Sequence, residues 1–169
     1  MPKQPLARNG VEFGIQTSTT GDRWFTTPAP IVDGLYFPGY SIADAAPDLG
    51  DSAITETAGL GGFAMAAAPA IVKFVGGTPD QAMANTAAMG HITIGRNGGF
   101  ALPPMSFAGT PAGIDARKVV DTGFSRLSIP GLRIATQAGQ IGAGITRAPL
   151  DCFTKAVTAL ASTVPDETP

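Results

Sequence analysis

Residues 44–77, DAAPDLGDSAITETAGLGGFAMAAAPAIVKFVGG, decide how we expect the rest of this chain to be organised. A polar segment runs into the Gly-rich link 59–62, and an almost uncharged apolar run follows. Ser52 to Glu56 has the pattern of a helix start, with Asp51 or Ser52 as the cap and acids near the positive end of the dipole. This layout can hold an anionic group on backbone N–H donors, and it also suits an ordinary corner between two helices.

The apolar run, residues 63–74, is expected to form a buried helix. It contains a single charged side chain, Lys73, so it has no polar face to present to water. Pro69 lies inside the run and should kink or divide the helix, because proline cannot donate a backbone hydrogen bond there.

Length and composition favour one folded domain. A chain of 169 residues with 44% apolar and 14% charged residues can bury a substantial core and is unlike a disordered chain. The 22 glycines and 15 prolines predict many loops and short helices. We expect a flexible lead at residues 1–8, a single domain at 9–163 and a loose tail at 164–169.

Charge and cysteine usage exclude several classes of function. A net charge of -2 with scattered basic residues leaves no electrostatic footprint for nucleic acid or for an anionic membrane surface. The apolar runs are too short to span a bilayer, and the first residues, MPKQPLARNG, lack a signal-peptide core. The single cysteine, Cys152, fits a reducing compartment. These features predict a cytoplasmic protein.

Strands and helices are mixed around the central stretch without a regular alternation. The sequence therefore predicts an α+β fold, with short helices that include the central buried Ala/Gly-rich helix and a few antiparallel strands. Thr78, Pro79 and Gln81 have the pattern of a capping box that opens a helix reaching about residue 95. The other expected elements are a hairpin of 11–17 with 23–27, a strand bent at Pro130-Gly131 within 126–136, and a closing helix at 152–162. Residues 113–123 are expected to form a short helix, and a strand through Lys118 to Val120 is the alternative.

A second glycine cluster is formed by Gly139, Gly142 and Gly144. Its spacing is not the dinucleotide-binding fingerprint, and the Walker pattern is absent from the sequence. The cluster favours a close approach of two backbones, and a phosphate cradle is the alternative.

Few side chains have the chemistry of a catalytic or ligand-binding site. One His and one Cys cannot supply a structural zinc set or a convincing nucleophilic triad, so we expect no metal and no cofactor. Carboxylates near glycine turns would shift one another's pKa if they shared a pocket; these are Asp48, Asp51 and Glu56. Guanidinium groups that could clamp a carboxylate or phosphate are those of Arg23, Arg117 and Arg147.

Five segments resemble the YlbE-like (AllG-type) family: NGVEFGI, GDRWFT, DGLYFPGYS, DLGDSAITETAGLGGFAMAAAPAIVKFVGG and GQIGAG. The resemblance runs from Asn9 to about Leu160 and corresponds to the C-terminal part of longer family members. It implies a subunit of oxamate carbamoyltransferase, a hetero-oligomeric enzyme of allantoin degradation. That enzyme interconverts oxalurate plus phosphate with oxamate plus carbamoyl phosphate.

We place candidate roles for this chemistry on the matching residues. Asp51 and Glu56 would be catalytic, polarising or deprotonating the carbamoyl nitrogen. The N–H groups of Gly59, Gly61 and Gly62 would stabilise developing oxyanion charge. The other substrate-binding residues would be Arg23, Ser52, Thr55, Arg117 and Gln140.

The resulting hypothesis is a subunit or domain of a carbamoyl-transferring complex that acts on a ureido acid or a related amide. It implies a small anionic substrate and partner protein subunits, without nucleic acid or membrane. The alternative is a non-catalytic structural or assembly subunit, in which the glycine-rich turns serve backbone packing alone.

Overall fold

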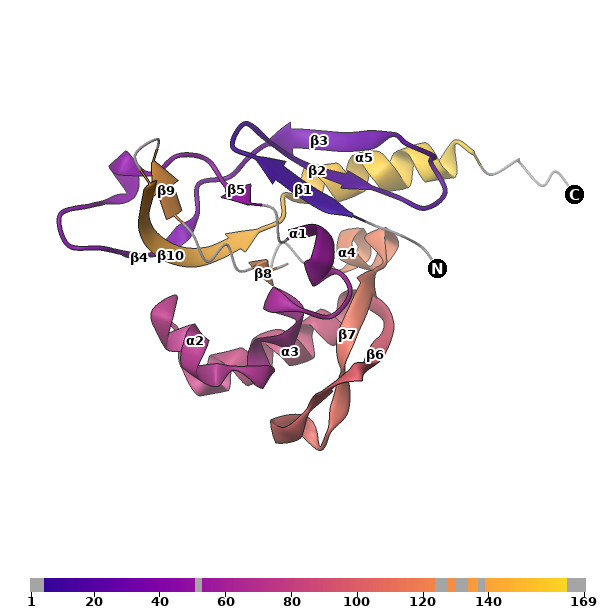
Figure 1. Cartoon of the computed structure of the whole chain (residues 1–169). Helices are drawn as coiled ribbons and strands as arrows, with labels where there is room; N and C mark the ends of the chain where they lie inside the picture. The colour runs from indigo at the N-terminus through magenta and orange to yellow at the C-terminus, as the bar shows by residue number, and fades with distance from the viewer. Residues whose placement is uncertain (1–4, 51–52, 124–127, 130–133, 137–138, 164–169) are drawn as a thin grey trace, which may run out of the picture.

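The computed structural model describes residues 5–50, 53–123, 128–129, 134–136 and 139–163. Short helices and antiparallel sheets make up this part of the chain, so the predicted α+β class is confirmed (Figure 1). The loose tail predicted at 164–169 lies outside the described residues.

The first sheet has four antiparallel strands in the order β3-β2-β1-β5. They are β1 (Leu6–Asn9), β2 (Glu12–Gln16), β3 (Trp24–Pro28) and β5 (Leu49–Gly50). The predicted hairpin is confirmed, since β2 pairs with β3 from Glu12 to Gln16. The flexible lead predicted for residues 1–8 is wrong from Leu6 onward. Leu6 is buried in the core, and β1 pairs with β2.

The second sheet is built around β10 (Gly139–Arg147), which pairs with β4 (Asp33–Tyr36), β8 (Ser128–Ile129) and β9 (Ile134–Thr136). A Cβ on Gly142 or Gly144 would collide with the backbone of β4. The predicted close approach of two backbones is therefore confirmed at these two glycines. The bend expected at Pro130-Gly131 lies outside the described residues.

The central apolar run is divided, as Pro69 predicted. A 3-10 helix, η2 (Gly61–Ala67), ends before Ala68, whose φ of -139° is not helical, and α2 (Pro69–Phe74) starts with the proline in its first turn. Two further short helices, η1 (Ile42–Asp44) and α1 (Ala53–Glu56), precede η2.

Helix α3 (Pro79–Ile92) begins with the predicted capping box. The Thr78 N–H donates to Gln81 Oε1 at 2.7 Å, and the Gln81 N–H donates to Thr78 Oγ1 at 3.3 Å. The helix ends at Ile92, earlier than predicted. The chain continues directly into β6 (Thr93–Leu102), then into η3 (Pro103–Met105) and β7 (Ala108–Ile114). Strands β6 and β7 pair with each other and form a two-stranded ribbon.

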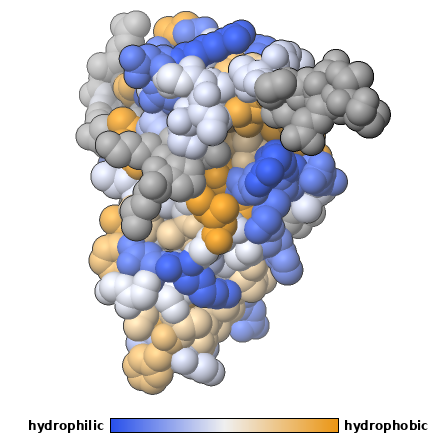
Figure 2. Space-filling view, turned by 90° about the vertical axis from the view of Figure 1, so that its right-hand side faces the viewer, coloured by the Kyte–Doolittle hydropathy of each residue, from blue (hydrophilic) through white to orange (hydrophobic). Residues whose placement is uncertain are grey.

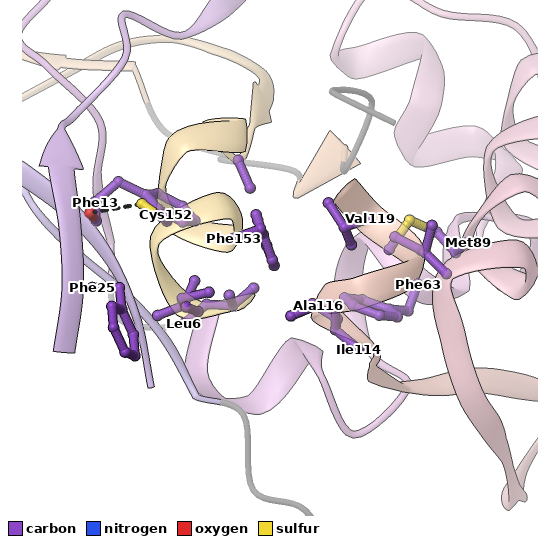
Figure 3. Packing of buried hydrophobic residues seen from close by; sticks show 14 residues of the cluster. Leu6, Phe13, Phe25, Phe63, Met89, Ile114, Ala116, Val119, Cys152 and Phe153 are labelled. Carbon is purple, nitrogen blue, oxygen red and sulfur yellow. Dashed lines mark hydrogen bonds between the residues drawn. The ribbon is translucent and has the colours of Figure 1, made fainter. Parts of the chain in front are cut away.

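One hydrophobic core joins the first sheet to the helices (Figure 3). Helix α5 (Leu150–Ala161) packs on β2 and β3 and on α4 (Ala116–Thr122), whose first turn is capped by Asp115. Phe153 of α5 is fully buried between the sheet side of this core and the side that holds Val119. The predicted helices at 113–123 and 152–162 are thus confirmed.

Candidate functional site

Three buried ionisable side chains meet where β1, β5 and α1 come together. Arg8, Asp48 and Glu56 form this buried charge cluster, and their side chains are between 0% and 4% exposed. Arg8 Nη1 lies 3.3 Å from Asp48 Oδ2, and Arg8 Nη2 lies 4.0 Å from Glu56 Oε1. At 4 Å and an effective dielectric constant near 20, two unit charges attract by about 4 kcal/mol before the desolvation cost is counted.

The strand pairing explains why Arg8 points into this place. Arg8 is opposite Gly50 in the β1–β5 pair, and the guanidinium lies directly against that glycine. A Cβ on Gly50 would come within 2.8 Å of Arg8 Nη2. A side chain at position 50 would therefore displace the guanidinium from this place.

Glycines also surround Glu56. Gly61 has a φ of +54°, and a Cβ there would lie 2.6 Å from Glu56 Cδ. The Gly62 N–H donates to Glu56 Oε2 at 3.3 Å, and the Gly59 N–H donates to the Glu56 carbonyl oxygen at 2.9 Å. The Gly-rich link thus folds back over the carboxylate that precedes it, and three of its amides, those of Gly59, Leu60 and Gly62, donate hydrogen bonds to that same residue.

Burial dominates the electrostatics of Asp48. Desolvation raises the pKa of its carboxyl, and the charge of Arg8, with the Arg8 hydrogen bond and the nearby Thr146 hydroxyl, opposes this rise in part. Thr146 lies on β10, so the second sheet also contributes to the environment of the cluster.

Several predicted site residues bond elsewhere. The Arg23 guanidinium lies over the Phe25 ring, 4.9 Å from its centroid. Arg117 is 73% exposed and pairs with Asp115 at 2.8 Å, which lowers the pKa of that carboxyl. Gln140 Nε2 donates to the Gly142 carbonyl oxygen at 3.0 Å. The substrate-binding roles of these three residues stay predictions.

The other predicted residues lie at the start of α1. Thr55 is exposed on that helix, whereas Asp51 and Ser52 lie outside the described residues. The roles of Asp51, Ser52 and Thr55 also stay predictions, as do the oxyanion-stabilising roles of Gly59, Gly61 and Gly62.

Sequence reasoning missed Arg8, which it placed in a flexible lead. A usable signal was present, because Asn9-Gly10 is a typical hairpin turn and such a turn needs a strand on each side. The pairing of Arg8 with acids 40 and 48 positions further along the chain has no local signature.

A separate open cleft of about 660 Å³ lies between β4 and β10 on one side and α2 and α3 on the other. Its polar lining includes Asp33, Gln81, Asn85 and Arg147. Arg147, one of the three predicted clamps, therefore faces a space that a small anion could enter.

The described residues contain neither a metal-binding cluster nor a helix suited to crossing a membrane. Within this part of the chain, no group of three or more His, Cys, Asp or Glu side chains could hold a metal ion. None of its described helices combines the length and apolar character needed to cross a membrane.

Together these features define a class: an α+β protein in which glycine-rich turns close over a buried guanidinium–carboxylate cluster. Residues 4–52 match the family model described as oxamate carbamoyltransferase subunit AllG. The chain is 47% identical over 161 residues to the "Oxamate carbamoyltransferase subunit AllG" of Escherichia coli (strain K12), which covers 94% of this chain and 38% of that protein. The chain belongs to the AllG-type family, as its sequence segments indicated.

Two other relatives have names that state no function. "Uncharacterized protein YahG" of Escherichia coli (strain K12) is 47% identical over 155 residues, which cover 90% of this chain and 32% of that protein. A crystal structure of a conserved protein of unknown function from Enterococcus faecalis V583 superposes with a TM-score of 0.88 at 47% identity, covering 95% of this chain and 39% of that one. The chain thus spans between about a third and two fifths of the length of these relatives.

Proposed function

We propose that this chain is a domain or subunit of an oxamate carbamoyltransferase-type enzyme that acts on a small ureido acid. The 47% identity to the E. coli protein of that name, over 161 residues, carries this proposal. In the proposed reaction a phosphate oxygen attacks the carbamoyl carbon of oxalurate, the C–N bond breaks, and the departing oxamate nitrogen takes a proton. In the reverse direction a base removes that proton.

Glu56 is the group we assign to this proton transfer. Its carboxylate is oriented from two sides, by Arg8 and by the Gly62 N–H, so its position is fixed by the fold. A fixed carboxylate can act as a general acid in one direction and a general base in the other. Asp48 would hold Arg8 in place and thereby position Glu56.

The test is the Glu56→Gln variant, assayed with its partner subunits co-expressed. We expect turnover to fall by about 10²–10⁴-fold, the usual contribution of general acid–base catalysis. Glu12→Gln is the matched control, because Glu12 is an exposed glutamate on β2 that accepts a hydrogen bond from Thr26. Asp48→Asn gives the second comparison, since it disturbs the same cluster without removing Glu56. Unchanged turnover of Glu56→Gln, measured well below its melting temperature, would remove Glu56 from the mechanism.

A second candidate function is a structural or assembly subunit. The observation that favours it is the burial of the charge cluster. Two carboxylates that pair with one guanidinium and are almost inaccessible to solvent are also typical of an internal ion-pair network. Thermal unfolding with oxalurate, oxamate, phosphate and carbamoyl phosphate separates the two functions. A ligand at a hundred times its Kd should stabilise by about 2.7 kcal/mol, and a flat response to all four would favour the structural role.

A further inference from the structure

The β6–β7 ribbon has no charged residue over 18 consecutive positions. Residues 97–114, NGGFALPPMSFAGTPAGI, contain no Asp, Glu, Lys, Arg or His, although single charged residues are spread along much of the rest of the sequence. In Figure 1 the ribbon extends downward, away from the first sheet and α5. The one charged side chain of the ribbon is Arg96 of β6, which precedes this segment and donates from Nη1 to the Gly109 carbonyl oxygen at 2.8 Å. An uncharged segment of this length that protrudes is unusual, because protruding ribbons normally present charged side chains to water.

The far end of the ribbon exposes two aromatic side chains. Phe107 is 71% exposed and Phe100 is 42% exposed, and Pro103 and Pro104 between them are exposed as well. We call these four residues the ribbon tip. Figure 2 shows apolar surface gathered at the lower end of the molecule, at the height where Figure 1 places the ribbon tip.

The tip is held in a fixed geometry. Leu102 is fully buried, and its carbonyl oxygen accepts a hydrogen bond from the Phe107 N–H at 2.9 Å. Ser106 and Phe107 both have left-handed backbones, with φ of +55° and +56°, a conformation that costs energy for residues other than glycine. Nearer the base, Asn97 Nδ2 donates to the Ala58 carbonyl oxygen at 2.7 Å. The fold therefore keeps a bulky aromatic side chain pointing outward at the expense of backbone strain.

We propose that the ribbon tip is a docking surface for the part of an AllG-type polypeptide that lies outside the region matched by this chain. In the E. coli AllG relative the matched region is 38% of the protein, and in the E. faecalis structure it is 39%. In both relatives, therefore, about three fifths of the polypeptide lies outside the matched region. An exposed aromatic pair on an uncharged support is the typical anchor of a protein interface, and it fits an uncharged apolar pocket on that partner segment.

This proposal rests on the family membership and not on the catalytic role of Glu56. Its test needs no turnover, so a failure of one proposal leaves the other open to its own experiment.

The test is co-purification of two polypeptides expressed in the same cells. One is this chain with an affinity tag. The other is E. coli AllG from which the matched region has been deleted, once circular dichroism has established that this remainder folds on its own. Phe107→Ser and Phe100→Ser are the test variants. Trp24→Ser is the matched control, because Trp24 is also aromatic, is 41% exposed and lies on β3, at the opposite end of the molecule from the ribbon tip (Figure 1).

We expect the wild-type chain and Trp24→Ser to retain the partner, and each tip variant to recover at least tenfold less of it. Circular dichroism of the isolated variants should show wild-type melting, because the replaced rings are exposed. Equal recovery by all variants would overturn the proposal, and so would failure of the wild-type chain to retain the partner. Sedimentation of the chain alone supplies the last check. A dimer that depends on Phe107 would assign the tip to a second copy and overturn the proposal in its present form.

Discussion

Arg8 brings a permanent positive charge into the interior, and its two carboxylate partners make that burial tolerable. Replacing one member of a buried ion pair leaves the other charge without compensation, which typically costs about 3–5 kcal/mol. We therefore expect Arg8→Met to lower the free energy of unfolding at pH 7 by about that amount, measured by urea denaturation. Arg23→Met is the control. Its guanidinium lies over the Phe25 ring, so its loss should cost less than about 1 kcal/mol.

The pH dependence of Arg8→Met gives a second readout of the same prediction. Burial already raises the pKa of Asp48 in the folded chain, and Arg8 is the charge that opposes this rise. Without Arg8 the folded-state pKa of Asp48 should rise further above its unfolded value of about 3.9. The folded variant then holds a proton that the unfolded chain has released, so its stability falls as pH rises from about 4 towards neutrality. A destabilisation independent of pH would contradict this account.

Gly61 and Gly21 are a matched pair of glycines that separates the cost of backbone strain from the cost of side-chain collision. Gly61 and Gly21 have nearly the same φ, +54° and +60°, but only the Gly61 position would bring a Cβ against Glu56, 2.6 Å from Cδ. Gly21→Ala should cost about 1–2 kcal/mol through the left-handed backbone alone. We expect Gly61→Ala to cost at least about 1 kcal/mol more in urea denaturation. Equal losses would show that Glu56 moves aside freely.

Among the elements, β10 shows how far sequence reasoning reaches. The spacing of Gly142 and Gly144 predicted that two backbones approach closely, and this is confirmed, but nothing local to β10 indicates that β4 is the partner. Pro69 predicted the division of the central helix for the same kind of reason, since a proline acts on its own backbone. The β6–β7 ribbon was missed, because the helix that Thr78 caps was predicted to reach about residue 95, whereas the chain already enters β6 at Thr93.

The glycines of β10 yield a prediction at this scale. A Cβ on Gly144 would strike the Asp33 backbone and lie 2.7 Å from Val32 Cγ1, so β4 could not keep its pairing. We expect Gly144→Ala to destabilise the chain by about 1–3 kcal/mol, the usual cost of overpacking. Gly95→Ala is the control from another strand, because a Cβ at Gly95 meets nothing within 4 Å. A similar loss in both variants would indicate that glycine flexibility, and not the close approach, sets the cost.

For the whole molecule, Cys152 is a natural probe of global unfolding. Its side chain is fully buried in the core that joins the first sheet to α3, α4 and α5, and its thiol contacts the Phe13 carbonyl oxygen at 3.5 Å. Burial raises the pKa of this thiol to about 11. Both burial and the scarcity of thiolate therefore protect it in the folded state, while in the unfolded chain it should behave as an ordinary cysteine with a pKa near 8.5.

We expect the native chain at pH 8 to react with a thiol-specific reagent only through the unfolded state, so that the labelling rate reports the free energy of unfolding. Each loss of about 1.4 kcal/mol should raise that rate tenfold. Arg8→Met and Gly144→Ala lie in different parts of the fold, and both should speed labelling by the factor that their urea denaturation gives. Gly95→Ala should leave the rate unchanged. Rapid labelling of the native wild-type chain would mean that α5 opens locally from the sheet, and that the core does not unfold as one unit.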